Sequence, residues 1–387
     1  MNFIATMPAK KTGKVVAPRP VSLYNCYAMH FSPIGKAANC LAALLFLALP
    51  HELVPVAAAA TYYVATNGND TWDGLSTNTA WRRMLTTMTR VAAGDTVRVL
   101  PGTYADNFPV YKPISIIGSD LYDPQAAPWA RHVPRTILCP LDTNSPGSAV
   151  ITVVTGGVRI LNLTITGDRD GAGMPDAKAG ISSTYRPLEV RRCKIANTGG
   201  YGIMWQGTTP PPQPTDGANR KGYIVQNLTT NVTHTNLTMA TGMYLSQVAV
   251  ECISNVMGWI QGTNSRSAVY MEQCYSTTNM PSGMLADHNT FRYCDVAIWT
   301  LQLERGGRSF SFSRNWITNG IIGMRVCGAG GQGLVRENII NVSGITESGL
   351  TPARGIWIQA DADPWSGAES TDHQVLYNRV SGASAGP

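Results

Sequence analysis

The sequence predicts an all-β solenoid built from stacked parallel coils. One short unit recurs, in which apolar and polar residues alternate up to an Asn or Cys and a second β-like run follows. Alternation with a period of two indicates strands rather than helices, and Gly follows most units, where the chain must turn. The units end at Asn162, Cys193, Asn227, Cys252, Cys274, Cys294, Asn315, Asn338 and Asn378.

The spacing of these units indicates coils of constant girth that carry loop insertions. Successive units lie 31, 34, 25, 22, 20, 21, 23 and 40 residues apart, so the short spacings cluster between 20 and 25. One coil cannot bury its inner face alone, and stacked neighbours therefore share a continuous core. This single elongated domain replaces the two or three globular domains that 387 residues would allow.

Composition and charge narrow the class of protein. Charged residues make up 14% of the chain, against about 25% in ordinary globular proteins, which disfavours disorder and long charged helices. The net charge of +6 divides into +4 for residues 1–60, with five basic residues and one acidic, and +2 for residues 61–387, with 25 basic and 23 acidic. So small a surplus leaves no basic face for nucleic acid.

Residues 1–60 have the pattern of an export leader. Basic residues precede the nine apolar residues at 41–49, and AAAA follows at 57–60. This order is typical of a secretory signal, and nine residues are too few for a membrane span, which takes about 20. A start at Met29 would give a signal of ordinary length. We expect a secreted or periplasmic protein without stable membrane insertion.

Three segments near the predicted mature N-terminus carry a family resemblance. They are TYYVATNGNDTWDG at 61–74, AGDTVRVLPGTYAD at 93–106 and KPISIIGSD at 112–120. They resemble the N-terminal block of right-handed parallel β-helix proteins of the pectin-lyase-like superfamily. The resemblance implies a right-handed parallel β-helix with a short capping helix at 79–93. Residues 61–120 would form the cap and first coils, and 121–387 the remaining coils, which stop before a C-terminal cap and suggest a truncated chain.

The same resemblance is weak for chemistry. The superfamily includes polysaccharide lyases, glycoside hydrolases, carbohydrate esterases, epimerases and non-catalytic members, and a fold does not fix a function. In many members the outward face of the first strand of each coil binds polysaccharide. The resemblance therefore implies where to look for a site, and not which reaction takes place there.

The Asn and Cys column should stack along the solenoid. Asn amides in equivalent turns can hydrogen-bond from coil to coil, and Cys is a small apolar residue that fits the same place. Four cysteines are expected in this column as thiols, with disulfide pairing left open: Cys193, Cys252, Cys274 and Cys294. Cys139 and Cys327 have no evident partner.

Alignment on the Gly that follows each column residue predicts the outward face. The segments used include GWIQG at 258–262 and GMLADH at 283–288. The first residue after Gly is apolar in every coil and should point inward. Because side chains alternate along a strand, the second and fourth residues after Gly should point outward. The first outward column holds Tyr244, Trp299, Arg325 and Trp357. The second holds Gln206, Ser246, Asp287 and Gln359.

Aromatic rings beside amides suit a sugar, because ring faces stack on the sugar and amides bond to its hydroxyl groups. We therefore expect substrate binding by five residues of these columns: Tyr244, Trp299, Trp357, Gln206 and Gln359. The alternative is that loops from the insertions cover the aromatic side chains.

Catalytic candidates lie at the ends of the same predicted strands. They are Asp287, His288, Glu304, Arg325 and Asp361. Adjacent coils lie about 4.8 Å apart, so Asp287 and Glu304 would suit the separation of about 5 Å in a retaining hydrolase, and carboxylates two coils apart the wider inverting geometry. A lyase would need a base and a cation for the uronate carboxylate. Similarity to arginine-dependent lyases suggests Arg325 or Arg305 for this role.

One acidic loop raises the question of a metal. Asp168, Asp170 and Asp176 lie in GDRDGAGMPD, and hard cations bind several oxygen ligands. The loop matches only part of a calcium site and contains Arg169, and Asp361 with Asp363 forms a smaller group. A polar turn is the preferred interpretation, so no metal ligand and no cofactor are assigned, and calcium stays an alternative.

Two functions are consistent with these patterns. The first is a secreted monomer that binds and cleaves a polysaccharide, by hydrolysis or β-elimination on the outward first-strand face. The second is a non-catalytic extracellular β-helix that acts as a structural or glycan-binding surface protein.

Overall fold

The computed structural model describes residues 58–141, 148–171, 175–185, 187–207, 221–234, 240–262, 266–272, 274, 284–301, 310–327, 333–342, 353–359 and 373–382. Residues 58–387 form one compact unit. The predicted leader lies almost wholly outside the described residues, as do Glu304, Arg305, Asp361 and Asp363. Within the described ranges, the helices are too short or too polar to cross a membrane.

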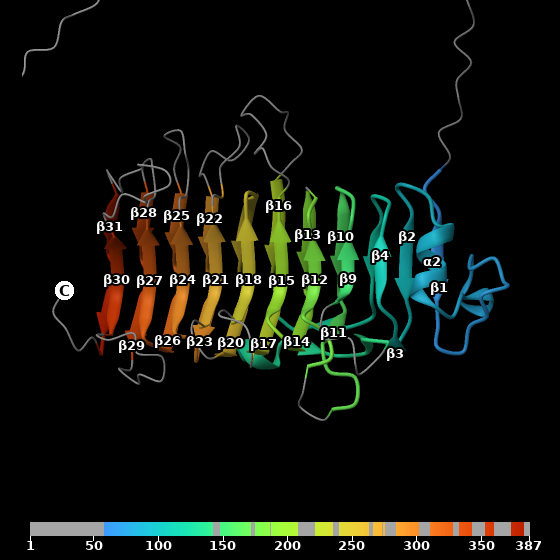
Figure 1. The fold of residues 1–387 in the computed structure, drawn as a ribbon, viewed down its shortest axis with the longest axis horizontal. Coiled ribbons are helices and arrows are strands. Elements are labelled where there is room, and N and C mark those ends of the chain that lie inside the picture. The colour runs from blue at the N-terminus through green and yellow to red at the C-terminus, as the bar shows by residue number, and fades with distance from the viewer. Residues whose placement is uncertain are drawn as a thin grey trace, which may run out of the picture. The chain divides into compact units, whose positions relative to one another are not determined.

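Three long sheets of parallel strands make up this unit (Figure 1). Sheet A consists of β1 (Thr61–Val64), β2 (Thr96–Val99), β5 (Ser115–Ile117), β10 (Val158–Leu161), β13 (Leu188–Arg191), β16 (Lys221–Val225), β19 (Ala249–Ile253), β22 (Met284–Asp287), β25 (Phe310–Ser313), β28 (Gly333–Arg336) and β31 (Gln374–Leu376). Sheet B consists of β3 (Gly102–Ala105), β8 (Thr136–Cys139), β11 (Thr164–Thr166), β14 (Lys194–Thr198), β17 (Leu228–His234), β20 (Val256–Gly262), β23 (Thr290–Arg292), β26 (Trp316–Gly320), β29 (Ile339–Val342) and β32 (Arg379–Ser381). Sheet C consists of β4 (Phe108–Val110), β9 (Ala149–Val153), β12 (Ala179–Ser183), β15 (Tyr201–Gln206), β18 (Ala240–Ser246), β21 (Arg266–Glu272), β24 (Val296–Leu301), β27 (Ile322–Cys327) and β30 (Arg354–Gln359).

The order of the strands shows how the chain coils. From β10 onward each coil adds one strand to sheet A, one to sheet B and one to sheet C, and the next coil pairs with it in parallel register. The predicted right-handed parallel β-helix is thereby confirmed. Outside these sheets, β6 (Leu121–Tyr122) and β7 (His132–Val133) form a short antiparallel ribbon.

Inward side chains from the three sheets form one continuous core. In sheet C the inward column is fully buried at Ile181, Ile203, Met243, Val269, Ile298 and Met324. In sheet B the matching column includes Ile165, Ile195, Met257, Phe291, Ile317 and Ile340. No charged residue belongs to this cluster, which explains why the sequence carries so little charge.

A short helix packs at the N-terminal end, as predicted. Helix α2 (Met84–Arg90) buries Met84 and Met88 in the core and contacts β4, the terminal strand of sheet C (Figure 1). It is shorter than the predicted 79–93. Thr79 belongs to the 3-10 helix η1 (Thr77–Thr79), and Trp81 is extended and pairs with Val64.

An asparagine ladder joins the coils at the turn between sheets A and B. Its members are Asn227, Asn255, Asn289, Asn315, Asn338 and Asn378. Each side-chain amide donates to the Oδ1 of the next Asn at 2.8–3.1 Å and to a backbone carbonyl of the preceding coil. Because these polar groups are satisfied inside the stack, their burial costs little.

The residue before each ladder position is left-handed, with φ between 52° and 58°. These residues are Asn162, Arg192, Gln226, Ser254, His288, Arg314, Glu337 and Tyr377. Non-glycine residues seldom adopt this conformation alone. Six of these residues precede a ladder asparagine and Arg192 precedes Cys193, so that ladder hydrogen bonds hold the backbone beside seven of the eight.

The predicted Asn and Cys column is correct in part. Cys193 occupies a ladder position, and its amide donates to Asn227 Oδ1 at 2.9 Å. Asn162 lies one residue earlier, and Cys252 is an inward residue of β19. Cys274 follows β21 and Cys294 follows β23, so the predicted thiol stack is wrong. No disulfide forms among the cysteines of the described ranges, including Cys139 and Cys327.

Candidate functional site

The strands of sheet C stand side by side across the middle of Figure 1. The outer face of this sheet carries a row of large side chains. Strand register aligns five residues on five consecutive strands: Tyr244, Tyr270, Trp299, Arg325 and Trp357. We call them the C-face row. The predicted first outward column is therefore confirmed in its placement. The intervening residues, such as Leu245 and Thr300, point into the core.

The aromatic members of the C-face row touch in sequence. Tyr244 stacks on Tyr270, with ring centroids 5.5 Å apart and planes 16° apart. Tyr270 meets Trp299 edge to face at 5.3 Å. Tyr201 extends the series at the other end, 5.6 Å from Tyr244. Such pairs stabilise one another beyond simple burial, so the rings present a fixed surface rather than independent side chains.

Cations continue the series towards the C-terminus. The Arg325 guanidinium carbon lies 4.7 Å from the Trp299 ring centre and 4.5 Å from that of Trp357. Arg354 lies 4.1 Å from the Trp357 ring. At the opposite end, Lys178 Nζ lies 5.8 Å from the Tyr201 ring. Cation–π contacts help to hold each of these cations in place over the rings.

A small apolar cluster anchors the two tryptophans of this row. Val296, Ile321 and Ile322 are buried together, and Trp299 and Trp357 pack against them. Both indoles remain half-exposed. The two rings are therefore fixed against this cluster, and Arg325 lies over both of them, so each ring is only partly accessible to a ligand.

The second outward column lies beside the C-face row. It holds Gln206, Ser246, Glu272, Leu301, Cys327 and Gln359 in register. The Tyr244 hydroxyl donates to Glu272 Oε2 at 2.8 Å. Burial, together with this carboxylate, raises the pKa of Tyr244, so its phenol stays protonated as the donor. The predicted Gln206, on the strand before that of Tyr244, is in register with Ser246, and Gln359 belongs to β30, three strands beyond Glu272.

Sequence reasoning missed Tyr270 and Glu272. The segment VYMEQC at 269–274 was interpreted as a turn-column unit because it ends in Cys, whereas it forms most of β21. Its likeness to MYLSQ at 243–247 was the available signal, since the two segments align residue by residue in sheet C.

Two segments of the alignment belong to other sheets. GMLADH lies in β22 of sheet A and GWIQG in β20 of sheet B. The physical reason is that Gly does not mark the same corner in every coil. Gly258 follows Asn255 by only three residues and lies within a sheet B strand. The predictions that Asp287 shares a face with Arg325, and that Trp259 points inward on sheet C, are therefore wrong.

Asp287 is instead the last residue of β22, which lies between β19 and β25 in sheet A. Its Oδ1 accepts from Ser313 Oγ at 2.8 Å and Arg314 Nε at 2.9 Å, and its Oδ2 lies 2.6 Å from an Arg314 amine and 2.9 Å from His288 Nδ1. Burial alone would raise the pKa of Asp287, but these hydrogen bonds outweigh it and lower the pKa. A carboxylate so engaged is ionised and poorly suited to give a proton. His288, at a left-handed turn position, is its neighbour.

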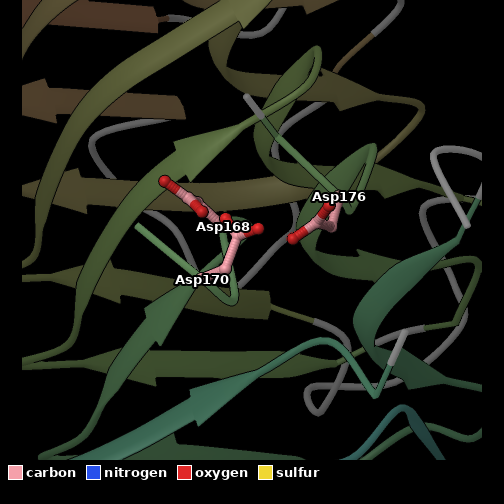
Figure 2. A group of neighbouring side chains, drawn as sticks. All are labelled: Asp168, Asp170 and Asp176. Carbon is pink, nitrogen blue, oxygen red and sulfur yellow. The ribbon is translucent and has the colours of Figure 1, made fainter. Parts of the chain in front are cut away.

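The three aspartates of the acidic loop do lie together. Carboxylate oxygens of Asp168, Asp170 and Asp176 are within 4.8 Å of one another, just after β11 (Figure 2). Backbone amides already occupy part of this group: Arg169 donates to Asp176 and Gly171 to Asp168, both at 2.9 Å. These hydrogen bonds are those of a polar turn.

No family model and no curated protein sequence matches the chain. Among solved structures it is similar to Escherichia coli YbhC, with 13% identity, a TM-score of 0.41, and 84% of this chain and 86% of that chain covered. It is also similar to the Aspergillus niger pectin methylesterase, with 10% identity, a TM-score of 0.39, and 84% of this chain and 86% of that chain covered. A third similar structure is gp49, a capsular polysaccharide depolymerase tailspike from Acinetobacter baumannii bacteriophage Fri1. Here the identity is 11%, the TM-score is 0.39, and 74% of this chain and 57% of that chain are covered. At these identities the likeness concerns the fold alone.

Proposed function

We propose that the protein binds an acidic polysaccharide chain along the outer face of sheet C. The observation that carries this proposal is the unbroken contact series from Tyr201 through the C-face row. The row spans five strands, and four spacings of about 4.8 Å give about 19 Å. A surface of this length fits a chain of several sugars better than a single one.

Charge favours an acidic chain over a neutral one. Three cations contact the rings of this face, Lys178, Arg325 and Arg354, against the single carboxylate of Glu272 among the described outward residues. Sugar rings would lie against the exposed parts of the C-face row, and the guanidinium groups over the tryptophans would meet carboxylates of the chain, a pairing for which arginine is well suited. The export leader predicted at residues 1–60 would place this face outside the cytoplasm.

Cleavage of the bound chain is the further part of this proposal. For β-elimination, Arg325 would lie between two sugar-stacking rings and so beside a bound uronate. For hydrolysis a pair of carboxylates is needed; Glu272 is one candidate, and the predicted Glu304 and Asp361 lie outside the described residues. The alternative is a non-catalytic glycan-binding protein, which the bond between Tyr244 and Glu272 favours because it engages the one described carboxylate.

Product analysis on a panel of acidic and neutral polysaccharides tests the reaction. Unsaturated uronate products, detected by ultraviolet absorbance, would report β-elimination, and new reducing ends alone would report hydrolysis. Each reaction is run with calcium and with a chelator, which also tests the calcium alternative. Binding without any product would support the non-catalytic function.

Binding is tested separately with one variant and one control. Trp299→Ala removes a ring of the C-face row and should weaken polysaccharide binding about tenfold or more, equivalent to about 1.4 kcal/mol. Tyr223→Ala is the matched control, because Tyr223 lies under Arg191 and Lys221 on sheet A instead. Equal loss in both variants, measured by isothermal titration, would contradict the assignment of binding to sheet C.

A further inference from the structure

A concave surface also lies on the outer face of sheet B, on different strands from the C-face row. This B-face cleft has a volume of about 430 Å³, within the range of about 300–1,000 Å³ common for ligand sites. Its lining residues are Pro128, Trp129, Thr290, Arg292, Trp316, Thr318, Asn319 and Asn341. Pro128 and Trp129 come from the 3-10 helix η2 (Pro128–Ala130), between β6 and β7, and the others come from β23, β26 and β29.

Trp316 is exposed in this cleft. It lies in the outward column of sheet B between Thr290 and Ile339, and 51% of its surface is accessible. An exposed aromatic side chain in a concave surface lined by polar groups is a typical feature of a ligand site. The lining combines Trp316 and Trp129 with the hydroxyl groups of two threonines and the amides of Asn319 and Asn341.

The second tryptophan of the cleft, Trp129, packs on an aromatic pair of sheet B, Trp259 and Tyr293, which we call the aromatic floor. Trp129 meets Trp259 edge to face at 4.8 Å, and Trp259 lies 5.3 Å from Tyr293. A Cβ at Gly258 would come within 2.8 Å of the Trp129 ring, so glycine makes room for it. Both contacts fix the η2 segment over sheet B.

The two residues of the aromatic floor occupy a left-handed backbone position that holds asparagine in other coils. Asn197, Asn231, Trp259, Tyr293 and Asn319 follow one another in the same left-handed position of sheet B, with φ between 51° and 55°. Asn tolerates this conformation, whereas bulky side chains seldom adopt it. The two aromatic exceptions are the residues that support Trp129.

Charge in the cleft comes from a single residue. Arg292 lies 4.7 Å over the Tyr293 ring and donates to its hydroxyl at 3.0 Å, which fixes the guanidinium. No carboxylate belongs to the eight described lining residues. We propose that the B-face cleft binds one hexuronate residue, with the sugar ring on Trp316, the carboxylate on Arg292, and hydroxyl groups on Asn319 and Asn341. This site is independent of the function proposed for sheet C.

The test measures binding of monosaccharides to the full chain by saturation-transfer NMR and titration. The probes are glucuronate and galacturonate, with glucose and galactose as their neutral counterparts. We expect at least one uronate to bind better than its neutral counterpart. Trp316→Ala should weaken that binding about tenfold, and Arg292→Gln should remove the preference for the uronate.

Two variants serve as controls. Ile339→Ala changes the next residue of the same column, which is equally exposed at 51% but does not line the cleft, and should leave binding unchanged. Trp299→Ala on sheet C should also leave it unchanged, which separates this site from the C-face row. The proposal is overturned if no probe binds, if Ile339→Ala costs as much as Trp316→Ala, or if only Trp299→Ala abolishes binding.

Discussion

The outer faces of sheets A and C are built from the same coils but treat charge differently. On sheet A, Arg159 pairs with Glu189 at 2.8 Å, and Lys221 pairs with Glu251. On sheet C, Arg325 and Arg354 lie over indole rings. On sheet A a cation lies beside a carboxylate, whereas on sheet C a cation lies beside an aromatic ring, so the two faces offer a ligand different chemistry. The coil therefore provides register only, and the outward residues decide whether a face meets water or a ligand.

The largest expected effect tests the register on which both faces depend. Asn289→Ala removes the acceptor of the Asn255 backbone and side-chain amides and the donor to the Cys252 carbonyl. Each buried group left unpaired costs about 1–3 kcal/mol, so we expect the free energy of unfolding to fall by about 3 kcal/mol or more. Urea denaturation followed by circular dichroism measures it. The exposed Asn341→Ala is the control, and equal losses would argue against a stabilising ladder.

The next largest effect on stability is expected at Asp287, at the end of β22 in sheet A. Asp287→Asn removes the charge that Arg314 and Ser313 bond to, and we expect a loss of about 2 kcal/mol at neutral pH. Because folding lowers the pKa of Asp287, the advantage of the wild type is complete above the ordinary pKa of 3.8 and disappears as pH falls through the folded pKa. Denaturation from neutral to acid pH checks this. Lost polysaccharide cleavage at unchanged stability would instead assign Asp287 to catalysis.

A smaller effect tests charge on sheet C directly. Arg325→Gln should weaken binding of an acidic polysaccharide about tenfold, or about 1.4 kcal/mol, and reduce its dependence on salt. Binding of a neutral polysaccharide should change much less, because the rings remain. Arg159→Gln on sheet A is the matched control. If acidic and neutral chains lose affinity equally, Arg325 acts through packing rather than charge.

The smallest effect is expected on the exposed side of sheet A. Glu189→Gln removes the partner of Arg159 and Arg191. Exposed ion pairs contribute about 0–1 kcal/mol, so thermal unfolding should change little and polysaccharide binding not at all. A marked loss of polysaccharide binding would show that sheet A shares the ligand surface, and the contrast between the two faces would fail.

The fold was predictable because strand alternation and turn residues recur in every coil. The ladder was only half predictable, since Cys252 and Cys274 imitate its spacing while Asn255 and Asn289 lie nearby. Sequence distance cannot distinguish these, because loop insertions change the length of each coil. Only the register shows that Cys252 pairs with Ala286 inside sheet A.

The site followed the same rule. Tyr244, Trp299, Arg325 and Trp357 were placed correctly, because each follows a small residue that marks the start of a sheet C strand. Tyr270 and Asp287 were misplaced where that marker fails. The B-face cleft was not predictable, since Trp129 and Trp316 lie 187 positions apart in the sequence and line one cleft only because the η2 segment lies over sheet B.

The left-handed position before each ladder residue has a practical consequence. Seven residue types occupy it, from Ser254 to Tyr377. The conformation there does not require one residue type, although the side chains of His288 and Arg314 also bond to Asp287. These turn residues form a line with one position per coil, about 4.8 Å apart. Labels or binding groups could be attached along it at chosen intervals, for example at Ser254, Glu337 and Tyr377.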